Sequence, residues 1–330
     1  MNLDIDCSDY CSVKARSSKG FGLMWAGVKA TYGATRGKVC FEVSITGNND
    51  VSHLENEPNP HVLRCGWSAS DASMQLGEED LSWGYGGTGK KSVGCKFVDY
   101  GVRFGVGDIL GCYLVSVFSS FYQTYYVHLN LMFTQDFSND PVVMKYTVNG
   151  KDKGIAYRLY QRELKGRALF PHVLTKNQNF SVNFGQMPSP LMPLLPGFVH
   201  IGQLDVSDGL VRGPTAPAER EQCEVLMMIG LPGAGKTHWA SGHAKSHPEK
   251  QYNILGTNSL IDRMKVQGLP RKRNYSGRWE ALIEMCTNCF NELIKVASKR
   301  RRNYIIDQTN VFPTARFRKM EPFRVRLLNF

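Results

Sequence analysis

The chain has 330 residues, of which 42% are hydrophobic, and its formal net charge is +11. Single cores rarely grow past about 250 residues, so this length predicts two domains. The hydrophobic fraction is ample for packed cores, and the content of 32 Gly and 15 Pro is too modest for a disordered or fibrous chain. An odd number of cysteines, nine, is spread along the chain, which favours the reduced thiols of the cytosol or nucleus over a disulfide framework. The acidic start MNLDIDCSDY lacks the basic and apolar segments of a secretory signal.

Residues 1–190 read as short strands separated by turns. The segment Lys38–Ile45 alternates with the period of a strand, and Asn149-Gly150 divides two apolar-aromatic runs. Asn-Gly accepts the positive φ angles of a tight hairpin. With many short strands and no long amphipathic helix, this half is predicted to be an all-β sandwich. Its aromatic residues Trp25, Trp67, Trp83 and Tyr85 have two interpretations, a binding surface or, more commonly, core packing.

The segment Val115–Pro141 interrupts this pattern. Its part Val115–Phe133 is apolar enough to imitate a membrane span, but it contains Ser, Gln, Thr, His and Asn. Hydrocarbon would leave these polar groups unsatisfied, so no membrane partner is expected. A long exposed loop and a gene-model or splicing artefact remain alternative explanations for residues 115–141.

A change of composition marks the second half. Residues 191–221 are predicted to be a Pro-containing linker. Residues 222–330 then show a buried apolar strand in EVLMMI, a helical stretch to about Lys245, a long amphipathic helix in RWEALIEMCTNCFNELIKVASKR, and a second buried strand in NYIIDQTNV. This order predicts a P-loop α/β domain with a parallel sheet.

The loop between the first strand and helix of this half matches G-x-x-x-x-G-K-[ST] in full. It comprises Gly230, Leu231, Pro232, Gly233, Ala234, Gly235, Lys236 and Thr237. Glycines let backbone N–H groups converge on phosphates at a helix start, and the lysine reaches the β- and γ-phosphates. The loop therefore predicts binding of ATP, the alternative being a fold that has lost its ligand.

Magnesium accompanies the nucleotide in such sites. Thr237 and Asp307, which ends the strand YIID, are the predicted Mg²⁺-side residues. The alternative for Asp307 is a carboxylate that caps a loop or bonds to a neighbouring threonine.

The excess positive charge lies entirely in the second half. Residues 222–330 hold 19 Lys and Arg against 8 Asp and Glu, whereas residues 1–221 hold 21 of each. Such a basic surface attracts polyanions, although a solvated face without a partner is the alternative. The candidate nucleic-acid contacts are Arg271, Lys272, Arg273, Lys299, Arg300, Arg301 and Arg302. The run Ser298–Tyr304 is interpreted as a basic helix end or as a nuclear-import signal. Cys286-x-x-Cys289 is expected to pack in a core, since no second pair has zinc spacing.

Two resemblances to known families support this organisation. The motifs LMWAGVKATYGATRGKVCFEV, RCGWS, YTVNGKDKGIAY, LFPHVL and SVNFG resemble a SPRY domain, whose implied role is recognition of a protein partner. The motifs GLPGAGKT, YNILGTNSL and YIIDQTNV resemble polynucleotide 5′-kinases, in which an acid on the second strand's end activates the acceptor hydroxyl. Here that segment is Gly256-Thr257-Asn258, with Asp262 farther along. The resemblance therefore implies a pseudokinase that binds ATP without transferring phosphate.

The combination of both domains, with RNYSGRW and RRNYIIDQTNV, resembles the heterogeneous nuclear ribonucleoprotein U family, most closely its U-like protein 1 branch. The resemblance implies a nuclear RNA-binding scaffold of pre-mRNA processing and RNA splicing, with DNA as a further candidate partner. It also implies that the chain is a fragment or an incomplete isoform, because the family's SAP module and Arg-Gly-Gly tail are absent. Two other functions stay open: an active ATP-dependent polynucleotide 5′-kinase, and a protein adaptor with a vestigial P-loop.

Overall fold

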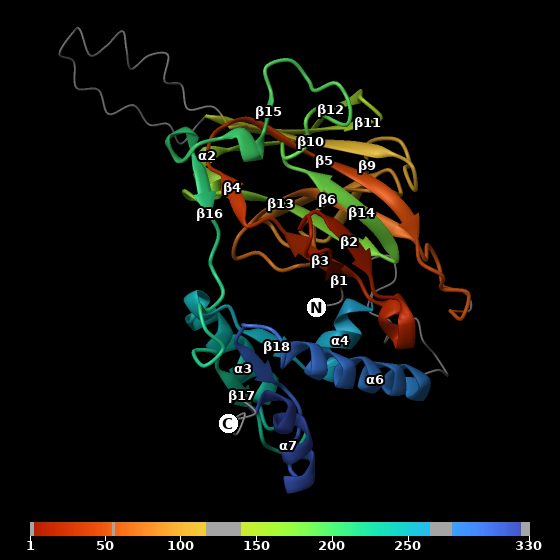
Figure 1. Cartoon of the computed structure of the whole chain (residues 1–330), viewed down its shortest axis with the longest axis vertical. Coiled ribbons are helices and arrows are strands. Elements are labelled where there is room, and N and C mark those ends of the chain that lie inside the picture. Colours follow the sequence, from red (N-terminus) through yellow and green to blue (C-terminus); the bar gives the residue numbers. More distant parts are fainter. Residues whose placement is uncertain (1–2, 55–56, 117–139, 265–278, 325–330) are drawn as a thin grey trace, which may run out of the picture.

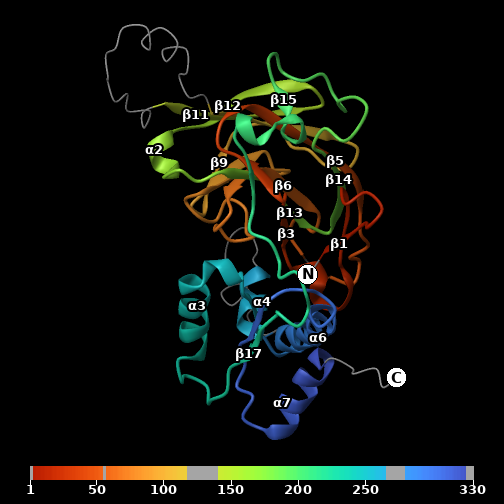
Figure 2. The same cartoon turned by 60° about the vertical axis from the view of Figure 1, so that its left-hand side comes forward.

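The computed structural model describes residues 3–54, 57–116, 140–264 and 279–324. The predicted insert at 115–141 and the basic residues Arg271, Lys272 and Arg273 therefore lie largely or wholly outside the described residues. Figures 1 and 2 show two layers of strands above a smaller group of helices and short strands. This arrangement confirms the predicted fold class, a β-sandwich followed by a P-loop α/β part.

The sandwich consists of two antiparallel sheets. The first has the order β1 (Leu3–Ile5), β2 (Ser12–Ala15), β14 (Gln178–Asn183), β5 (Gly37–Asn48), β10 (Ile109–Ser116), β11 (Pro141–Val148), β12 (Lys151–Tyr160). The second has the order β16 (Leu210–Arg212), β4 (Tyr32–Ala34), β13 (Leu169–Lys176), β6 (Val62–Ala69), β7 (Ser82–Gly86), β8 (Lys90–Val93), β9 (Lys96–Asp99), and β3 (Ala26–Lys29) pairs with β13. A one-turn helix, α2 (Gln161–Leu164), follows β12.

Aromatic side chains fill the space between the sheets. Phe41 of β5 meets Trp67 of β6 edge to face, with ring centroids 5.1 Å apart. Trp67 and Tyr85 are completely buried and Trp83 is 6% exposed, so core packing is the correct interpretation for these three residues. Trp25 differs, because it is only half-buried and lines a pocket. The Asn149-Gly150 hairpin joins β11 to β12 with φ angles of 51° and 74°, as the sequence predicts.

Part of the proline-containing segment 191–221 is attached to the sandwich. Within it, β15 (Val199–His200) pairs with β5 and β16 pairs with β4. The buried carboxylate of Glu42 on β5 accepts hydrogen bonds from the backbone N–H groups of Leu191 and Met192, each 2.9 Å long. The same carboxylate accepts a bond from Asn183 and lies 3.0 Å from His200 Nε2. One buried charge thus fastens this segment to the first sheet.

The α/β part is built on a three-stranded parallel sheet. Its order is β17 (Val225–Met227), β19 (Tyr304–Ile306), β18 (Asn253–Leu255). Four helices accompany it: α3 (Lys236–Ser246), α4 (Thr257–Arg263), α6 (Trp279–Ala297) and α7 (Pro313–Met320). The long helix α6 is amphipathic as predicted, and it buries Leu282, Cys286, Cys289 and Leu293. Burial raises the pKa of Cys289 to about 12, which agrees with a packed thiol.

The core of the α/β part includes side chains from the start of the sandwich. The 3₁₀ helix η1 (Ser18–Leu23) lies against α6 (Figure 1), and its Phe21 and Leu23 join one buried cluster with residues of α4, α6, β18 and β19. The backbone approach is close, since a Cβ on Gly20 would lie 2.9 Å from the Cβ of Met285. In addition, Trp25 N–H donates to the carbonyl of Arg263 at the end of α4. The two halves therefore share a hydrophobic core.

This shared core yields a stability prediction. Phe21 is 3% exposed, so Phe21→Ala removes a buried ring and should destabilise the chain by about 3–5 kcal/mol. Because the ring packs beside α6, amide hydrogen exchange within α6 should accelerate together with exchange in η1. Val206→Ala, at a position 80% exposed, is the control and should change neither quantity. Unchanged protection of α6 in Phe21→Ala would mean that the halves fold independently.

The Glu42 network yields a pH prediction. Burial raises the pKa of Glu42, but hydrogen bonds involving His200, Leu191, Met192 and Asn183 outweigh burial and lower the pKa below its ordinary value. A carboxyl group whose pKa is lower in the folded state stabilises the fold at pH values above its unfolded-state pKa of about 4.3. That stabilisation is lost as the pH falls through the pKa of the folded state. Glu42→Gln should therefore cost about 1.5–3 kcal/mol at pH 7 and flatten the acid limb of stability.

Urea unfolding between pH 3 and pH 7 measures this effect. The exposed Glu249 offers a control, and Glu249→Gln should keep the pH profile of the original chain. Equal acid sensitivity in Glu42→Gln and the original chain would contradict the assignment.

Candidate nucleotide-binding site

The predicted phosphate loop joins β17 to α3 in an open conformation. Gly233 and Gly235 have φ angles of +81° and +78°, and a Cβ on either would meet no atom within 4 Å. The backbone conformation, rather than a crowded neighbour, therefore requires glycine at both positions. A hydrogen bond from Gly230 N–H to the Thr309 carbonyl, 2.9 Å long, fixes the start of the loop beside the end of β19.

This loop borders a pocket of about 580 Å³ at the carboxyl ends of the parallel strands. The loop and the start of α3 contribute Pro232, Gly233, Gly235, Lys236, Thr237 and His238. The start of α4 contributes Thr257 and Asn258, and the segment after β19 contributes Asp307, Gln308 and Thr309. Ligands of open α/β sheets bind at this edge, where helix starts present free N–H groups.

Thr237 and Asp307 meet inside the pocket. The Thr237 hydroxyl donates a hydrogen bond of 2.7 Å to Asp307 Oδ2, and Asp307 is only 9% exposed. Their proximity follows from the sheet order, because β17 and β19 are neighbours and their carboxyl ends lie side by side. A hydroxyl oxygen and a carboxylate are hard donors that suit Mg²⁺, so these two residues fit a magnesium-bound nucleotide.

Lys236 occupies the first position of α3. Its Nζ donates to the Leu231 carbonyl over 2.7 Å, across the mouth of the loop. A bound phosphate would replace that neutral carbonyl with a charged acceptor, and hydrogen bonds between charged partners are the stronger kind. Leu231 itself is 68% exposed, and three of the predicted loop residues, Gly230, Leu231 and Ala234, do not line the pocket.

The side of the pocket opposite the loop carries no second carboxylate among the residues that the structure describes. Thr257 and Asn258 line it, whereas Asp262 is exposed on α4 and does not line it. Among the described lining residues, Asp307 is the one acid, and it is hydrogen-bonded to Thr237. A neutral hydroxyl and a neutral amide cannot take a proton from an acceptor alcohol at pH 7.

Of the predicted nucleic-acid contacts, the four that the structure describes lie away from this pocket. Lys299, Arg300, Arg301 and Arg302 are exposed in the turn between α6 and β19, so they lie at the amino end of the strand that Asp307 follows. They follow the end of α6, the position that the interpretation of a basic helix end predicts, but none of the four lines the phosphate pocket. The sequence motif missed the liners His238, Gln308 and Thr309, whose only signal is adjacency to motif residues.

The cysteine pair in the long helix and the predicted absence of a membrane span can also be compared with the structure. Cys286 and Cys289 are buried in the core around α6, and none of the nine cysteines, all within the described residues, forms a disulfide bond. Within the described ranges, no group of three His, Cys, Asp or Glu side chains could hold a metal ion. No helix in the described part of the chain combines the length and apolar character needed to cross a membrane.

Known proteins resemble this chain over most of its length. Residues 225–328 match the AAA domain family. Heterogeneous nuclear ribonucleoprotein U-like protein 2 of Mus musculus is 36% identical over 307 residues, 93% of this chain and 38% of the relative, and the Homo sapiens protein matches equally. The probable ATP-dependent RNA helicase ddx1 of Dictyostelium discoideum is 30% identical over 182 residues, 55% of this chain and 19% of the relative.

Among solved structures, a human SPRY domain aligns with 57% of this chain and 98% of its own, at a TM-score of 0.39 and 18% identity. The chain spans about 38% of the length of the ribonucleoprotein relatives that it matches. Whether it falls in the U-like protein 1 branch stays a prediction. The resemblance to the heterogeneous nuclear ribonucleoprotein U family that the sequence motifs indicate is confirmed over nearly the whole chain.

Proposed function

We propose that this chain acts as a nuclear RNA-associated scaffold in pre-mRNA processing and splicing. Its α/β part binds ATP with Mg²⁺ and does not transfer the phosphate, and its sandwich binds a protein partner. The observation that carries this proposal is the composition of the phosphate pocket. It contains Gly233, Gly235, Lys236 and the Thr237–Asp307 pair, but no second carboxylate among the described liners.

Binding is supported by the residues that face a nucleotide. The N–H groups at the start of α3 and the Lys236 ammonium would hold the phosphates. Thr237, backed by Asp307, would hold the magnesium ion, which neutralises phosphate charge when bound. The volume of about 580 Å³ lies in the range of small-molecule sites.

The absence of transfer is supported by the acceptor side. Phosphoryl transfer needs a group that receives the acceptor's proton or orients it. Thr257 and Asn258 have no basic group, and Asp262 is exposed outside the pocket. The specific alternative, an active polynucleotide 5′-kinase, would have to use Asp307 as the base while that carboxylate is bonded to Thr237.

Association with RNA is supported by charge and by the resemblance to ribonucleoproteins. The basic turn Lys299–Arg302 is exposed, and Arg301 is tied to the linker by a hydrogen bond to the Ala218 carbonyl. Exposed guanidinium groups bind phosphates and release counterions. Because this turn lies away from the phosphate pocket, RNA and ATP would bind at separate places.

The first test is nucleotide binding. With Mg²⁺ and ATP at about a hundredfold excess over Kd, binding stabilises the folded chain by about 2.7 kcal/mol, so the melting temperature should rise by roughly 5 °C. Lys236→Ala removes the ammonium group and should lose most of the rise. Lys245→Ala, on the exposed part of the same helix, is the matched control and should keep it. If ATP with Mg²⁺ does not raise the melting temperature of the unaltered chain, the alternative of an adaptor with a vestigial P-loop is favoured.

The second test is transfer. A 5′-hydroxyl RNA oligonucleotide incubated with γ-labelled ATP should gain no more label than it gains with Lys236→Ala. Fluorescence anisotropy with the same oligonucleotide shows that the acceptor binds, and joint Arg300→Gln, Arg301→Gln and Arg302→Gln substitution should weaken that binding about tenfold or more at 0.1 M salt. Incorporation that depends on Lys236 would establish the 5′-kinase instead.

A further inference from the structure

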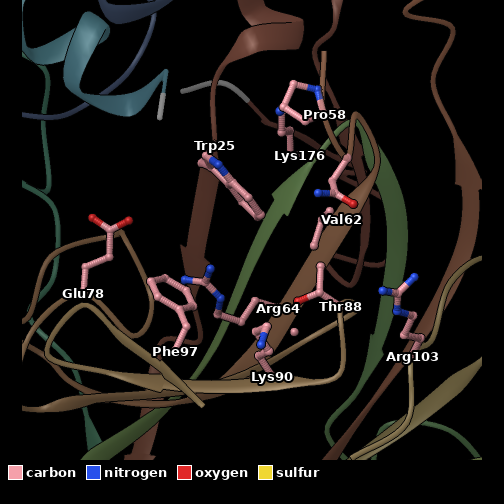
Figure 3. Close-up of a pocket in the computed structure, with 12 residues that line it drawn as sticks. Trp25, Pro58, Val62, Arg64, Glu78, Thr88, Lys90, Phe97, Arg103 and Lys176 are labelled. Carbon is pink, nitrogen blue, oxygen red and sulfur yellow. The ribbon is translucent and has the colours of Figure 1, made fainter. Parts of the chain in front are cut away.

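The sandwich carries a second pocket, of about 410 Å³, which the sequence motifs do not indicate. It lies beside β6, β7, β8 and β9 of the second sheet (Figure 3). The rings of Trp25 and Phe97 line it together with the cationic side chains of Arg64, Lys90, Arg103 and Lys176. We refer to it as the Arg64 pocket.

Arg64 is the central group of this pocket. The residue is 8% exposed, and its guanidinium carbon lies 5.3 Å from the Trp25 ring and 5.0 Å from the Phe97 ring. Figure 3 shows the guanidinium between these two rings. One terminal nitrogen donates to the Leu76 carbonyl. A guanidinium has five N–H donors, so this single hydrogen bond leaves most of its donor capacity free.

The fold holds this side chain in place. Arg64 pairs with Gly86 across β6 and β7, and a Cβ on the nearby Gly84 would lie 2.6 Å from Arg64 Cδ. The glycines of Ser82–Gly86 therefore make room for the aliphatic stem of Arg64 to cross β7. The charged end is positioned by backbone and rings rather than by an acidic neighbour.

No carboxylate within the described ranges lies at ion-pair distance from Arg64. Burial lowers the pKa of Arg64 to about 10, and the charge of Glu78, which also lines the pocket, acts in the opposite direction. Arg64 is therefore still charged at pH 7. Burying a charge is costly unless it is paired and hydrogen-bonded, and two ring contacts offset only part of that cost.

The other cations differ in how they are neutralised. Lys90 Nζ lies 2.6 Å from Asp99, and Lys176 is paired with the buried carboxylate of Glu57. Arg103 is exposed, with no ion-pair partner in the described part of the chain. Arg64 and Arg103 thus supply two guanidinium groups, one inside the pocket and one at its rim, that can receive an anion.

We propose that the Arg64 pocket binds an acidic peptide, with one oxyanion of a side chain held by Arg64, a further contact made by Arg103 at the rim, and the neighbouring residue packed on Trp25. This inference rests on the proposed role of the sandwich in binding a protein partner and names the chemistry of that partner. The oxyanion is a carboxylate of Asp or Glu, or the phosphate of a phosphoserine, since both match the guanidinium fork.

A peptide fits these observations better than a nucleic acid. Residues 1–221, which contain the sandwich, carry equal numbers of acidic and basic residues, so they lack the long-range attraction that a polyanion exploits. One buried guanidinium held between two aromatic rings recognises a single anion within an otherwise apolar or neutral segment. Aromatic and arginine residues of this kind are the usual anchors of protein interfaces.

A random dodecapeptide library selected against the whole chain tests the proposal. The enriched peptides should share an Asp or Glu, and replacing it with Gln should weaken binding at least tenfold in fluorescence polarisation. Phosphoserine at the same position distinguishes the two sources, because tighter binding than Glu indicates a phosphorylated partner and weaker binding indicates a plain carboxylate. Enrichment of no peptide, or of peptides without an acid, would overturn the proposal.

Variants of the chain locate the binding. Arg64→Gln should weaken binding of the selected peptide at least tenfold. Arg103→Gln, at the exposed rim, should weaken it about threefold and leave the fold intact. Arg158→Gln, exposed on β12 and outside the pocket, is the matched control and should bind normally. Unchanged affinity in both Arg64→Gln and Arg103→Gln would overturn the assignment, as would an oligouridine 12-mer that competes with the peptide for this pocket.

The proposal can fail separately from the nucleotide-binding function. Lys236→Ala should lose the ATP-dependent rise in melting temperature and keep the peptide affinity. An intact ATP response without an acid-dependent peptide would reject the Arg64 pocket alone.

Discussion

The contact between η1 and the helices of the α/β part is the constraint on which both candidate sites depend. Phe21 and Leu23 complete a core that also contains residues of α4 and α6. Helix α4 begins with Thr257 and Asn258 in the phosphate pocket and ends at Arg263, whose carbonyl accepts the N–H of Trp25. The Trp25 ring in turn covers Arg64. A few buried apolar side chains thus fix the element that borders one pocket and contacts the other.

The candidate nucleotide site illustrates how binding and reaction would depend on different parts of one fold. Binding needs a flexible glycine loop, a helix start, a lysine and a magnesium-side pair, and neighbouring parallel strands bring these together. Reaction needs one more group on the acceptor side, contributed by a different strand and helix. In this chain that position carries a hydroxyl and an amide, and the nearest acid on the helix, Asp262, is exposed to solvent.

Charge is distributed in a way that separates two kinds of recognition. The positive excess of residues 222–330 suits a polyanion, which needs many weak contacts over a broad surface. The neutral sandwich instead carries one pocket in which a buried guanidinium lies between aromatic rings. This contrast is consistent with a scaffold that holds RNA through one half and a protein through the other.

The amino-acid sequence by itself determined the fold class, the phosphate loop, the hairpin at Asn149-Gly150 and the amphipathic helix α6, because each depends on residues within one or two turns or strands. The pairing of Thr237 with Asp307 could also be anticipated, since loop and strand end follow a recurrent strand order. Only the tertiary structure decided the shared core at Phe21, the anchoring of Leu191 and Met192 by Glu42, and the enclosure of Arg64. These contacts join residues far apart in the chain, and no local period or spacing encodes which distant side chain fills a given space. The sequence also shows the basic run Lys299–Arg302, but not where it lies. Its position away from the phosphate pocket follows from the fold, because the run precedes β19 and the pocket lies at the other end of that strand.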